Sequence, residues 1–385
     1  MRMNVLFTSH YEHLRMGGQQ SMLEIIKHID RNKVHPFALI TADGELRQAL
    51  ENHECPTTIF TLPDVRRQFF LKRWLPEARK VFETVEKIRE LIRSQNIHIL
   101  HADEESDAVM CCLAAKGTHA KVIYHGRVSA PHKLDSIIAK KADYILGVSN
   151  SIYTCRFKEK NIDKKYQTIY DGADTGRFYA LEDSRALRRQ LNLPEDRFIV
   201  LFVGQIKLGK GILDLVDAFK IIRDQQRFEK MPQLVVAGRA LEISFQEKVH
   251  EKINTNGLSD CVTLIGQQPQ IQLWMQCADA IVLPSHEGTE GLGRVLFEGM
   301  MCGAVGITTN ISGTNEVVSN EVGFLVPEKN PLELANAITH LAKNPELKKE
   351  LRQKSIKSAL ERFDIRVHCR NIEKIYSLLC NQNRE

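Results

Sequence analysis

The 385-residue chain is long enough to build two domains with separate cores. Its 43% hydrophobic and 26% charged residues are ordinary for a globular protein, and its net charge of +5 is too small for a chain that coats nucleic acid. No apolar run approaches the roughly 20 residues of a membrane span, and the N-terminal run is too short for a signal peptide. Nine scattered cysteines without a C-x-x-C pair predict reduced thiols and a cytoplasmic protein.

In the first half of the chain, short apolar runs alternate with longer amphipathic segments. Residues 76–95 carry apolar positions at three- and four-residue spacing, which predicts a helix. The apolar runs are typical of strands that are buried on both faces of a parallel sheet. They are NVLFTS (4–9), HPFALIT (35–41), IHILHAD (97–103), AKVIYHG (120–126), YILGVS (144–149) and QTIYDG (167–172).

The second half repeats this alternation after a polar stretch between residues 178 and 194. Its predicted strands are FIVLFVG (198–204), QLVVAG (233–238), CVTLIG (261–266), DAIVLPS (279–285) and AVGITT (304–309). A single sheet of all these strands would be unusually large. We therefore predict two doubly wound α/β domains, 1–180 and 195–363, with a last helix at 364–385 that packs back on the first domain.

Ligands of such sheets bind where strands end and helices begin, because a helix N-terminus presents free N–H groups and a partial positive charge. One candidate turn is Gly17-Gly18, before a helix that we expect to open at about Ser21. Paired glycines let a backbone approach a phosphate, but the pattern is not G-x-G-x-x-G, and a plain turn is the alternative. The turn VGQIKLGKG offers Lys210, either as a partner for a diphosphate or as a solvated lysine.

The stretch PSHEGTEGLGRVLFEG is more specific, a glycine-rich turn between a strand and a helix that begins near Leu292. Glu290 and Glu298 flank the helix start, with the backbone N–H groups of residues 291–293 between them. A carboxylate can accept two hydroxyl hydrogens at once, so this arrangement suits the hydroxyls and diphosphate of a nucleotide-sugar. The alternative is that Arg294 and Glu298 form an i,i+4 pair and Glu290 is merely a loop charge.

EGLGRVLFE, followed by CGAVGITTNISGTNE and GFLV, resembles the donor-site signature of family-4 glycosyltransferases, whose fold is GT-B. That signature is a glutamate, seven residues and a second glutamate, then a strand and a glycine-containing loop that ends in glutamate. Gly17-Gly18, IYDGADTGRF and GKGILDLVDAF continue the resemblance, in order, from about residue 4 to residue 340. The resemblance implies two Rossmann-like domains that face each other.

The resemblance also implies roles at matching positions. Glu290 would contact the hydroxyls of the donor sugar, Glu298 the ribose, and Lys210 the leaving diphosphate. His125 would lie near the donor sugar and the reacting centre; without the resemblance, a capped histidine at a strand end is an equal interpretation. The implied catalytic residues are His125, Glu290 and Lys210, and the implied donor-binding residues are Gly17, Gly18, Gln205, Lys210, Gly291, Leu292, Gly293 and Glu298.

Three departures from the family pattern concern the donor. Gln205 stands where the family usually has arginine, so one positive charge on the diphosphate is missing, and Arg127 or Arg239 is a candidate to supply it. Asp171 stands where asparagine is common. The loop HEGTEG is two residues longer than usual between PS and the first glutamate.

The implied reaction is transfer of a sugar from a nucleotide-sugar with retention of configuration. A UDP-sugar is preferred over a GDP-sugar, and the acceptor would be a glycan or a lipid-linked glycan of a bacterial surface polysaccharide or lipopolysaccharide. No metal and no cofactor are expected, and the chain has no Asp-x-Asp, the metal-binding pair of the other large glycosyltransferase fold. The alternatives are a nucleotide-sugar epimerase on the same fold and a degenerate, non-catalytic binding protein.

The basic and aromatic stretch VRRQFFLKRW (65–74) suggests a second kind of partner. Such a segment can lie on an anionic membrane and meet a lipid-linked acceptor, which would make the cytoplasmic protein peripheral to the inner face of the plasma membrane. An ordinary loop and helix with a solvated basic face is the alternative. Nucleic acid is not expected as a partner.

Overall fold

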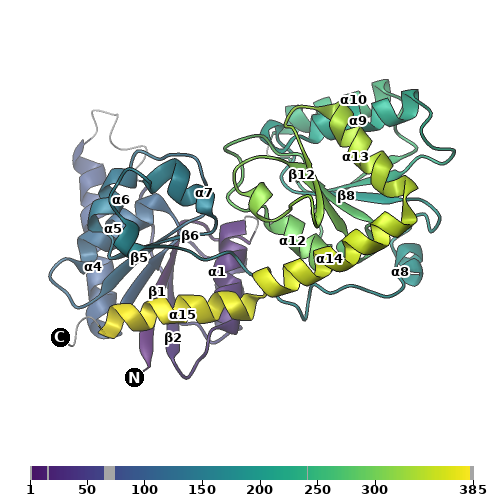
Figure 1. The fold of residues 1–385 in the computed structure, drawn as a ribbon. Helices are drawn as coiled ribbons and strands as arrows, with labels where there is room; N and C mark the ends of the chain where they lie inside the picture. Colours follow the sequence, from purple (N-terminus) through teal and green to yellow (C-terminus); the bar gives the residue numbers. More distant parts are fainter. Residues whose placement is uncertain (1, 15–16, 65–73, 241, 382–385) are drawn as a thin grey trace. The chain divides into compact units, whose positions relative to one another are not determined.

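The computed structural model describes residues 2–14, 17–64, 74–240 and 242–381. The chain divides into two units (Figure 1), of which the first combines Met1–Gly172 with Ile365–Glu385 and the second is Ala173–Asp364. Residues 173–180, which we predicted in the first domain, therefore lie in the second unit. The chain passes between the units at Ala173 and Asp364, which form a parallel bridge.

The first unit contains a seven-stranded parallel sheet with the order β3-β2-β1-β4-β5-β6-β7. The order reverses between β1 and β4, so the loops that follow these neighbours diverge and leave room for a ligand at their carboxyl ends. The strands are β1 (Met3–Ser9), β2 (Val34–Ile40), β3 (Thr57–Ile59), β4 (Ile99–Ala102), β5 (Lys121–Gly126), β6 (Tyr144–Gly147) and β7 (Tyr166–Thr168).

Helices cover both faces of this sheet. Val5 and Phe7 of β1 pack in one buried cluster with Ile25 of α1 and Tyr376 of α15, so the last helix completes the core of the first unit. The opposite face carries α4, α5 and α6 (Figure 1). The helices are α1 (Gly17–His28), α2 (Glu45–Glu51), α4 (Trp74–Ser94), α5 (Glu105–Ala115), α6 (Asp135–Lys141), α7 (Asn150–Ile152) and α15 (Ile365–Asn381), and a π-helical turn covers Tyr153–Phe157.

The second unit contains a six-stranded parallel sheet with the order β10-β9-β8-β11-β12-β13. Its order reverses between β8 and β11, which is again the point where a doubly wound sheet binds ligands. The strands are β8 (Ile199–Val203), β9 (Gln233–Ala237), β10 (Val262–Gly266), β11 (Ala280–Leu283), β12 (Val305–Thr309) and β13 (Gly323–Val326).

In the second unit α9, α10 and α13 pack together on one face, and α11, α12 and α14 pack on the other (Figure 1). The start of α13 follows from its sequence, because Pro331 occupies the first turn and the side chain of Asn330 accepts a hydrogen bond from the Glu333 amide. The helices are α8 (Arg185–Gln190), α9 (Ile212–Asp224), α10 (Ile243–Thr255), α11 (Ile271–Cys277), α12 (Arg294–Met301), α13 (Pro331–Lys343) and α14 (Pro345–Phe363).

The predicted fold class, two doubly wound α/β domains with parallel sheets, is confirmed. Two strands were missed, β3 and β13, and α1 opens at Gly17 rather than at Ser21. Within the described ranges, no helix combines the length and apolarity that crossing a bilayer requires. All nine cysteines fall in these ranges and are free thiols.

Candidate active site

The loops that follow β8, β11 and β12 touch one another at the carboxyl edge of the second sheet. Gly211 has a φ of 67°, and a Cβ there would lie 1.8 Å from the Pro284 carbonyl oxygen, so only glycine fits. The His286 amide donates to the Gly209 carbonyl at 2.9 Å. The loop after β12 also lies close to the loop after β11, because a Cβ on Gly313 would lie 2.5 Å from the Gly291 carbonyl oxygen. The fold thus joins three segments that are up to about 100 residues apart.

This loop contact brings Lys210 and Glu290 together. The Lys210 Nζ lies 2.5 Å from Glu290 Oε1, and the Ser285 hydroxyl donates to the same oxygen at 2.6 Å. Glu290 is only 7% exposed, so its charge depends on these partners. Burial lowers the pKa of the neighbouring Lys207, and the charge of Lys210 adds to this effect. An ammonium group has three N–H donors, so Lys210 can hold Glu290 and still donate to an anion.

Glu298 lies in α12, which begins at Arg294 and not near Leu292 as predicted. The helix opens after Gly293, which has a φ of 79° and serves as the N-cap. Glu298 is 5% exposed, and its carboxylate accepts a hydrogen bond from Arg294 at 2.9 Å. The i,i+4 pair proposed as the alternative therefore exists. The pair is nearly buried, with side-chain exposures of 13% for Arg294 and 7% for Glu298.

The backbone amides that precede α12 are free to bind a ligand. Among the described residues, no hydrogen-bond acceptor is found for the backbone N–H groups of Gly291, Leu292 and Gly293. They precede the N-terminus of α12, where the helix dipole adds a partial positive charge. These three amides and the Lys210 ammonium are donors suited to phosphate or sugar oxygens.

Gln205 lies two residues after the end of β8 and is half-buried. The next residue, Ile206, donates its amide to the Arg239 carbonyl at 3.0 Å, so the ends of β8 and β9 lie side by side. Arg239 is exposed there, whereas Arg127 in the first unit is engaged by two carboxylates. Arg239, one of the two predicted substitutes for the missing positive charge, therefore lies near Gln205.

In the first unit, Gly17 and Gly18 are the opening residues of α1, immediately beside the β1–β4 switch point. A Cβ on Gly18 would lie 3.4 Å from the Arg127 side chain, so the small residue allows the arginine to lie against the helix start. Arg127 Nη1 also donates to the Ser21 hydroxyl at 2.8 Å and to Asp171 at 2.9 Å. Asp171, one of the family departures, therefore neutralises an arginine.

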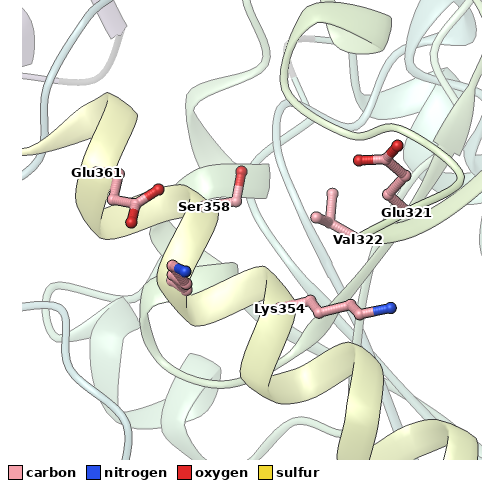
Figure 2. A pocket seen from close by; sticks show the side chains of 6 residues that line it. Glu321, Val322, Lys354, Ser358 and Glu361 are labelled. Carbon is pink, nitrogen blue, oxygen red and sulfur yellow. The ribbon is translucent and has the colours of Figure 1, made fainter.

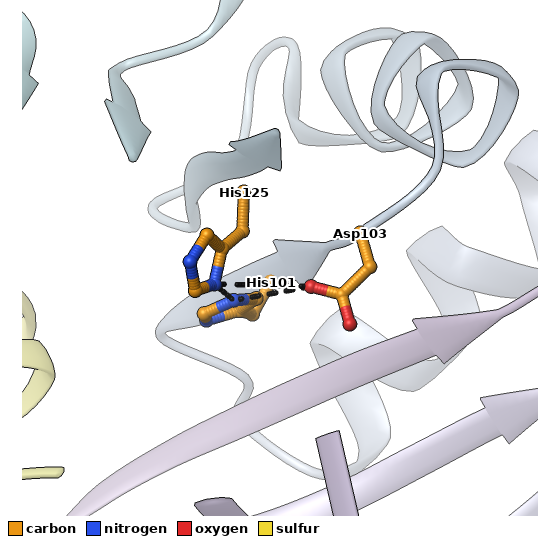
Figure 3. Close-up of side chains that lie close together, drawn as sticks. All are labelled: His101, Asp103 and His125. Atoms are coloured by element: carbon orange, nitrogen blue, oxygen red, sulfur yellow. Dashed lines mark hydrogen bonds and ion pairs between the residues drawn. The ribbon is translucent and has the colours of Figure 1, made fainter. Parts of the chain in front are cut away.

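His125 lies near the end of β5 and is completely buried. Its Nδ1 is 3.1 Å from His101 Nε2, and Asp103 lies beside both rings (Figure 3). The ligand atoms of these three residues lie within 4.8 Å of one another, as in metal sites. Arg127 contacts both Asp103, at 3.2 Å, and His125, at 3.4 Å, so a guanidinium already supplies positive charge here.

Comparison with known proteins decides the family. Residues 183–358 match the family described as glycosyl transferases group 1, a range that includes Lys210, Glu290 and Glu298. Residues 183–358 form a group 1 glycosyltransferase domain, and the chain is a glycosyltransferase.

Two curated relatives show how far this likeness extends. The glycosyltransferase is 24% identical over 304 residues to N-acetyl-alpha-D-glucosaminyl L-malate synthase of Bacillus anthracis, covering 75% of this chain and 77% of the relative. It is 24% identical over 279 residues to lipopolysaccharide 1,2-N-acetylglucosaminetransferase of Salmonella typhimurium, covering 69% of each chain.

A solved structure shows the fold. The Anabaena protein Alr3699/HepE, in complex with UDP and glucose, has a TM-score of 0.82 and 22% identity to this glycosyltransferase, and the match covers 98% of this chain and 100% of that one. The prediction of a GT-B glycosyltransferase is confirmed.

A hollow on the second unit of the glycosyltransferase lies away from these residues. Figure 2 shows it along α14, with basic and acidic side chains on its rim. None of the predicted site residues lines it, and we assign it no role. Its lining is Glu321, Val322, Lys354, Lys357, Ser358 and Glu361.

Sequence reasoning missed several residues that surround the predicted ones. Ser285 and Asp103 were recoverable, because each stands at the end of a predicted strand, where ligand-binding side chains gather. No sequence pattern marked Tyr376 as a site residue, since it contacts His101 across 275 residues of sequence.

Proposed function

We propose that this glycosyltransferase transfers a sugar from a nucleotide-sugar, with retention of configuration, to a glycan or lipid-linked acceptor. The preferred donor is a UDP-sugar. The observation that carries the proposal is the Lys210–Glu290 pair beside the amides of residues 291–293, at the switch point of the second sheet. A cation, a carboxylate and free amides within one loop cluster match a diphosphate that is bonded to a sugar.

The names of similar proteins support the donor and the pathway. Anabaena HepE has been crystallised with UDP, with UDP and glucose, and with UDP-glucose. Relatives include the Salmonella lipopolysaccharide transferase and a Staphylococcus aureus capsular polysaccharide glycosyltransferase, CapM. We therefore propose a place in bacterial cell-surface polysaccharide or lipopolysaccharide synthesis.

The proposed mechanism is electrostatic. Lys210 and the amides of residues 291–293 stabilise the charge that develops on the leaving diphosphate, and such preorganised donors are worth several kcal/mol when water is excluded. Glu290 holds hydroxyls of the donor sugar, and Glu298 holds the ribose. Neither a metal ion nor a cofactor is part of the proposal, because lysine and backbone donors take over the neutralisation of the phosphates.

A thermal-shift comparison of UDP, GDP, ADP and CMP tests the donor. A nucleotide that binds the native state raises the melting temperature, and at a hundred times its Kd it contributes about 2.7 kcal/mol. We expect UDP to give the largest shift, unchanged by added EDTA. Equal shifts from all four nucleotides, or none, would contradict a UDP-sugar donor.

Incubation with a UDP-sugar tests the two alternatives to a transferase, an epimerase and a non-catalytic binding protein. A UDP-sugar incubated without acceptor stays intact if the protein is a transferase. Formation of the epimeric sugar would instead indicate an epimerase. UDP binding without transfer to any envelope glycan or lipid-linked acceptor would indicate a binding protein.

Peripheral contact with an anionic membrane is also part of the proposal. The stretch 65–74 that motivates it lies outside the described residues except for Trp74, so its support is compositional. We expect salt-sensitive sedimentation with phosphatidylglycerol vesicles, weakened when four basic residues of this stretch become glutamine, because surface charges act only within about 10 Å at 0.1 M salt. The substituted residues are Arg66, Arg67, Lys72 and Arg73.

A matched variant controls for net charge. It replaces four exposed lysines elsewhere in the first unit by glutamine and should sediment like the parent. Equal loss in both variants, or no sedimentation of the parent, would remove the membrane contact. The control residues are Lys140, Lys141, Lys158 and Lys164.

A further inference from the structure

A chain of three buried side chains crosses the core of the first unit and ends at His125. The Tyr376 hydroxyl lies 2.6 Å from His101 Nδ1, and His101 Nε2 lies 3.1 Å from His125 Nδ1. Each of the three residues is at most 1% exposed. Tyr376 comes from α15, His101 from β4 and His125 from β5, so only the folded unit assembles the chain.

The direction of the hydrogen bonds follows from Arg127. Its Nη2 lies 3.4 Å from His125 Nδ1, and a guanidinium has only N–H donors. Burial alone would lower the pKa of Arg127, but the carboxylates of Asp103 and Asp171 outweigh burial and raise it, so the group stays charged. His125 Nδ1 must therefore be an acceptor, which leaves the proton of a neutral His125 on Nε2.

The remaining protons are then fixed. His101 Nε2 also donates to His125 Nδ1, whose single lone pair it shares with Arg127 Nη2, since two lone pairs would repel each other at 3.1 Å. Asp103 independently favours the same proton position, because its Oδ1 lies 3.6 Å from His101 Nε2. His101 Nδ1 is then an acceptor and Tyr376 its donor, and burial raises the pKa of Tyr376, which keeps its proton in place.

The series of hydrogen bonds from Tyr376 through His101 ends at His125 Nε2, a buried donor without an acceptor. Among the described residues, no hydrogen-bond partner is found for His125 Nε2. A buried polar group left unpaired costs about 1–3 kcal/mol, so proteins rarely retain one without a reason. His125 stands at the carboxyl end of the sheet, where ligands of this fold class bind, and it contacts Arg127, which lies against Gly18.

We propose that Tyr376 and His101 are positioning residues that fix Nδ1 of His125 as an acceptor, so that His125 offers its Nε2–H as a neutral hydrogen-bond donor to an oxygen of the sugar substrate. Burial, with Arg127 nearby, lowers the pKa of His125, in keeping with a neutral ring. The ring of His368 stacks on His125 with centroids 5.9 Å apart, which restrains its orientation. His125 then acts as a donor and not as a base. The substrate contact rests on the proposed function; the proton positions do not.

Nitrogen-15 NMR of the full chain, labelled at histidine, tests the proton positions without any substrate. The His125 resonances, assigned from their loss in His125→Gln, should show a neutral ring protonated at Nε2 from pH 6 to pH 8. In Tyr376→Phe, which keeps the shape of the side chain, the resonances of His101 should change. A His125 ring protonated at Nδ1 or at both nitrogens, or an unchanged His101 spectrum in Tyr376→Phe, would overturn the proposal.

Transfer kinetics test the donor role. Glutamine at position 125 can place an N–H near the position of Nε2, whereas asparagine places it near Nδ1. We expect His125→Gln to keep a kcat about tenfold above that of His125→Asn and Tyr376→Phe to lower kcat two- to tenfold, since one hydrogen bond contributes ~0.5–1.5 kcal/mol. Equal losses in the two amide variants would exclude the donor role.

The two measurements separate this inference from the proposed function. If the NMR pattern is found but the parent transfers no sugar from any nucleotide-sugar, the proposed function and the substrate contact of His125 are wrong, and the proton chain stands. If transfer is found but the NMR pattern is not, the proton chain is wrong and the proposed function stands.

Discussion

Lys210→Ala is expected to lower the transfer rate about a hundredfold or more, since removing one preorganised stabiliser of transition-state charge costs ~2.7–4 kcal/mol. The variant should also melt at a lower temperature, because it removes the ammonium group that lies 2.5 Å from the nearly buried carboxylate of Glu290. Initial rates and melting curves measure the two effects. Lys220→Ala is the control, since Lys220 forms an exposed pair with Asp224 that contributes little.

A double variant separates the two roles of Lys210. Adding Glu290→Gln to Lys210→Ala removes the carboxylate charge that Lys210 faced, so the melting temperature should recover, whereas the affinity for UDP, which does not depend on Glu290, should stay low. If UDP affinity recovered together with stability, Lys210 would act only as a structural partner of Glu290, and its assignment to the diphosphate would be wrong.

Alanine substitutions of the two glutamates are expected to affect different measurements, UDP binding for Glu298 and sugar transfer for Glu290. Glu298→Ala should weaken binding of both UDP and the donor, since ribose is common to both. Glu290→Ala should leave UDP binding intact or tighter, because it frees Lys210, but should depress transfer. A hydrogen bond to a charged group is worth ~1.5–3 kcal/mol, so we expect losses of roughly ten- to a hundredfold, measured by calorimetric titration and initial rates.

Arg294→Ala is the matched control for Glu298. It breaks the 2.9 Å pair while retaining the carboxylate. If the pair is the whole role of Glu298, both variants should lose stability and neither should lose UDP affinity. Equal effects of Glu290→Ala and Glu298→Ala on UDP binding would contradict the division of labour between them.

The strands that sequence reasoning found and missed differ in burial. HPFALIT and DAIVLPS were recognised because strands that are covered on both faces are apolar throughout. β3 was missed because it is a three-residue edge strand, and none of its side chains is fully buried. β13 is also an edge strand, with only four residues, of which two are half-buried. β3 is also mostly polar, whereas β13 is apolar but too short to stand out as a strand.

Some features of the candidate site could also be predicted from the sequence, and others could not. Glu290 and Glu298 could be found from local spacing, and Lys210 from the rule that ligands bind where strands end and helices begin. The Lys210–Glu290 pair could not be foreseen, because it depends on the approach of Gly211 to Pro284. The hydrogen-bonded series that ends at His125 could not be predicted for a different reason, since Tyr376 belongs to α15, far from His125 in the sequence.

That helix also determines the order in which the chain can fold during its synthesis. The second unit is one continuous segment, Ala173–Asp364, and has its complete sequence as soon as residue 364 leaves the ribosome. The first unit begins earlier but lacks Ile372, Ile375 and Tyr376 of its core until residue 376 has been made. Although domains generally fold in order from the N-terminus, here the unit that is made first must be the last to close.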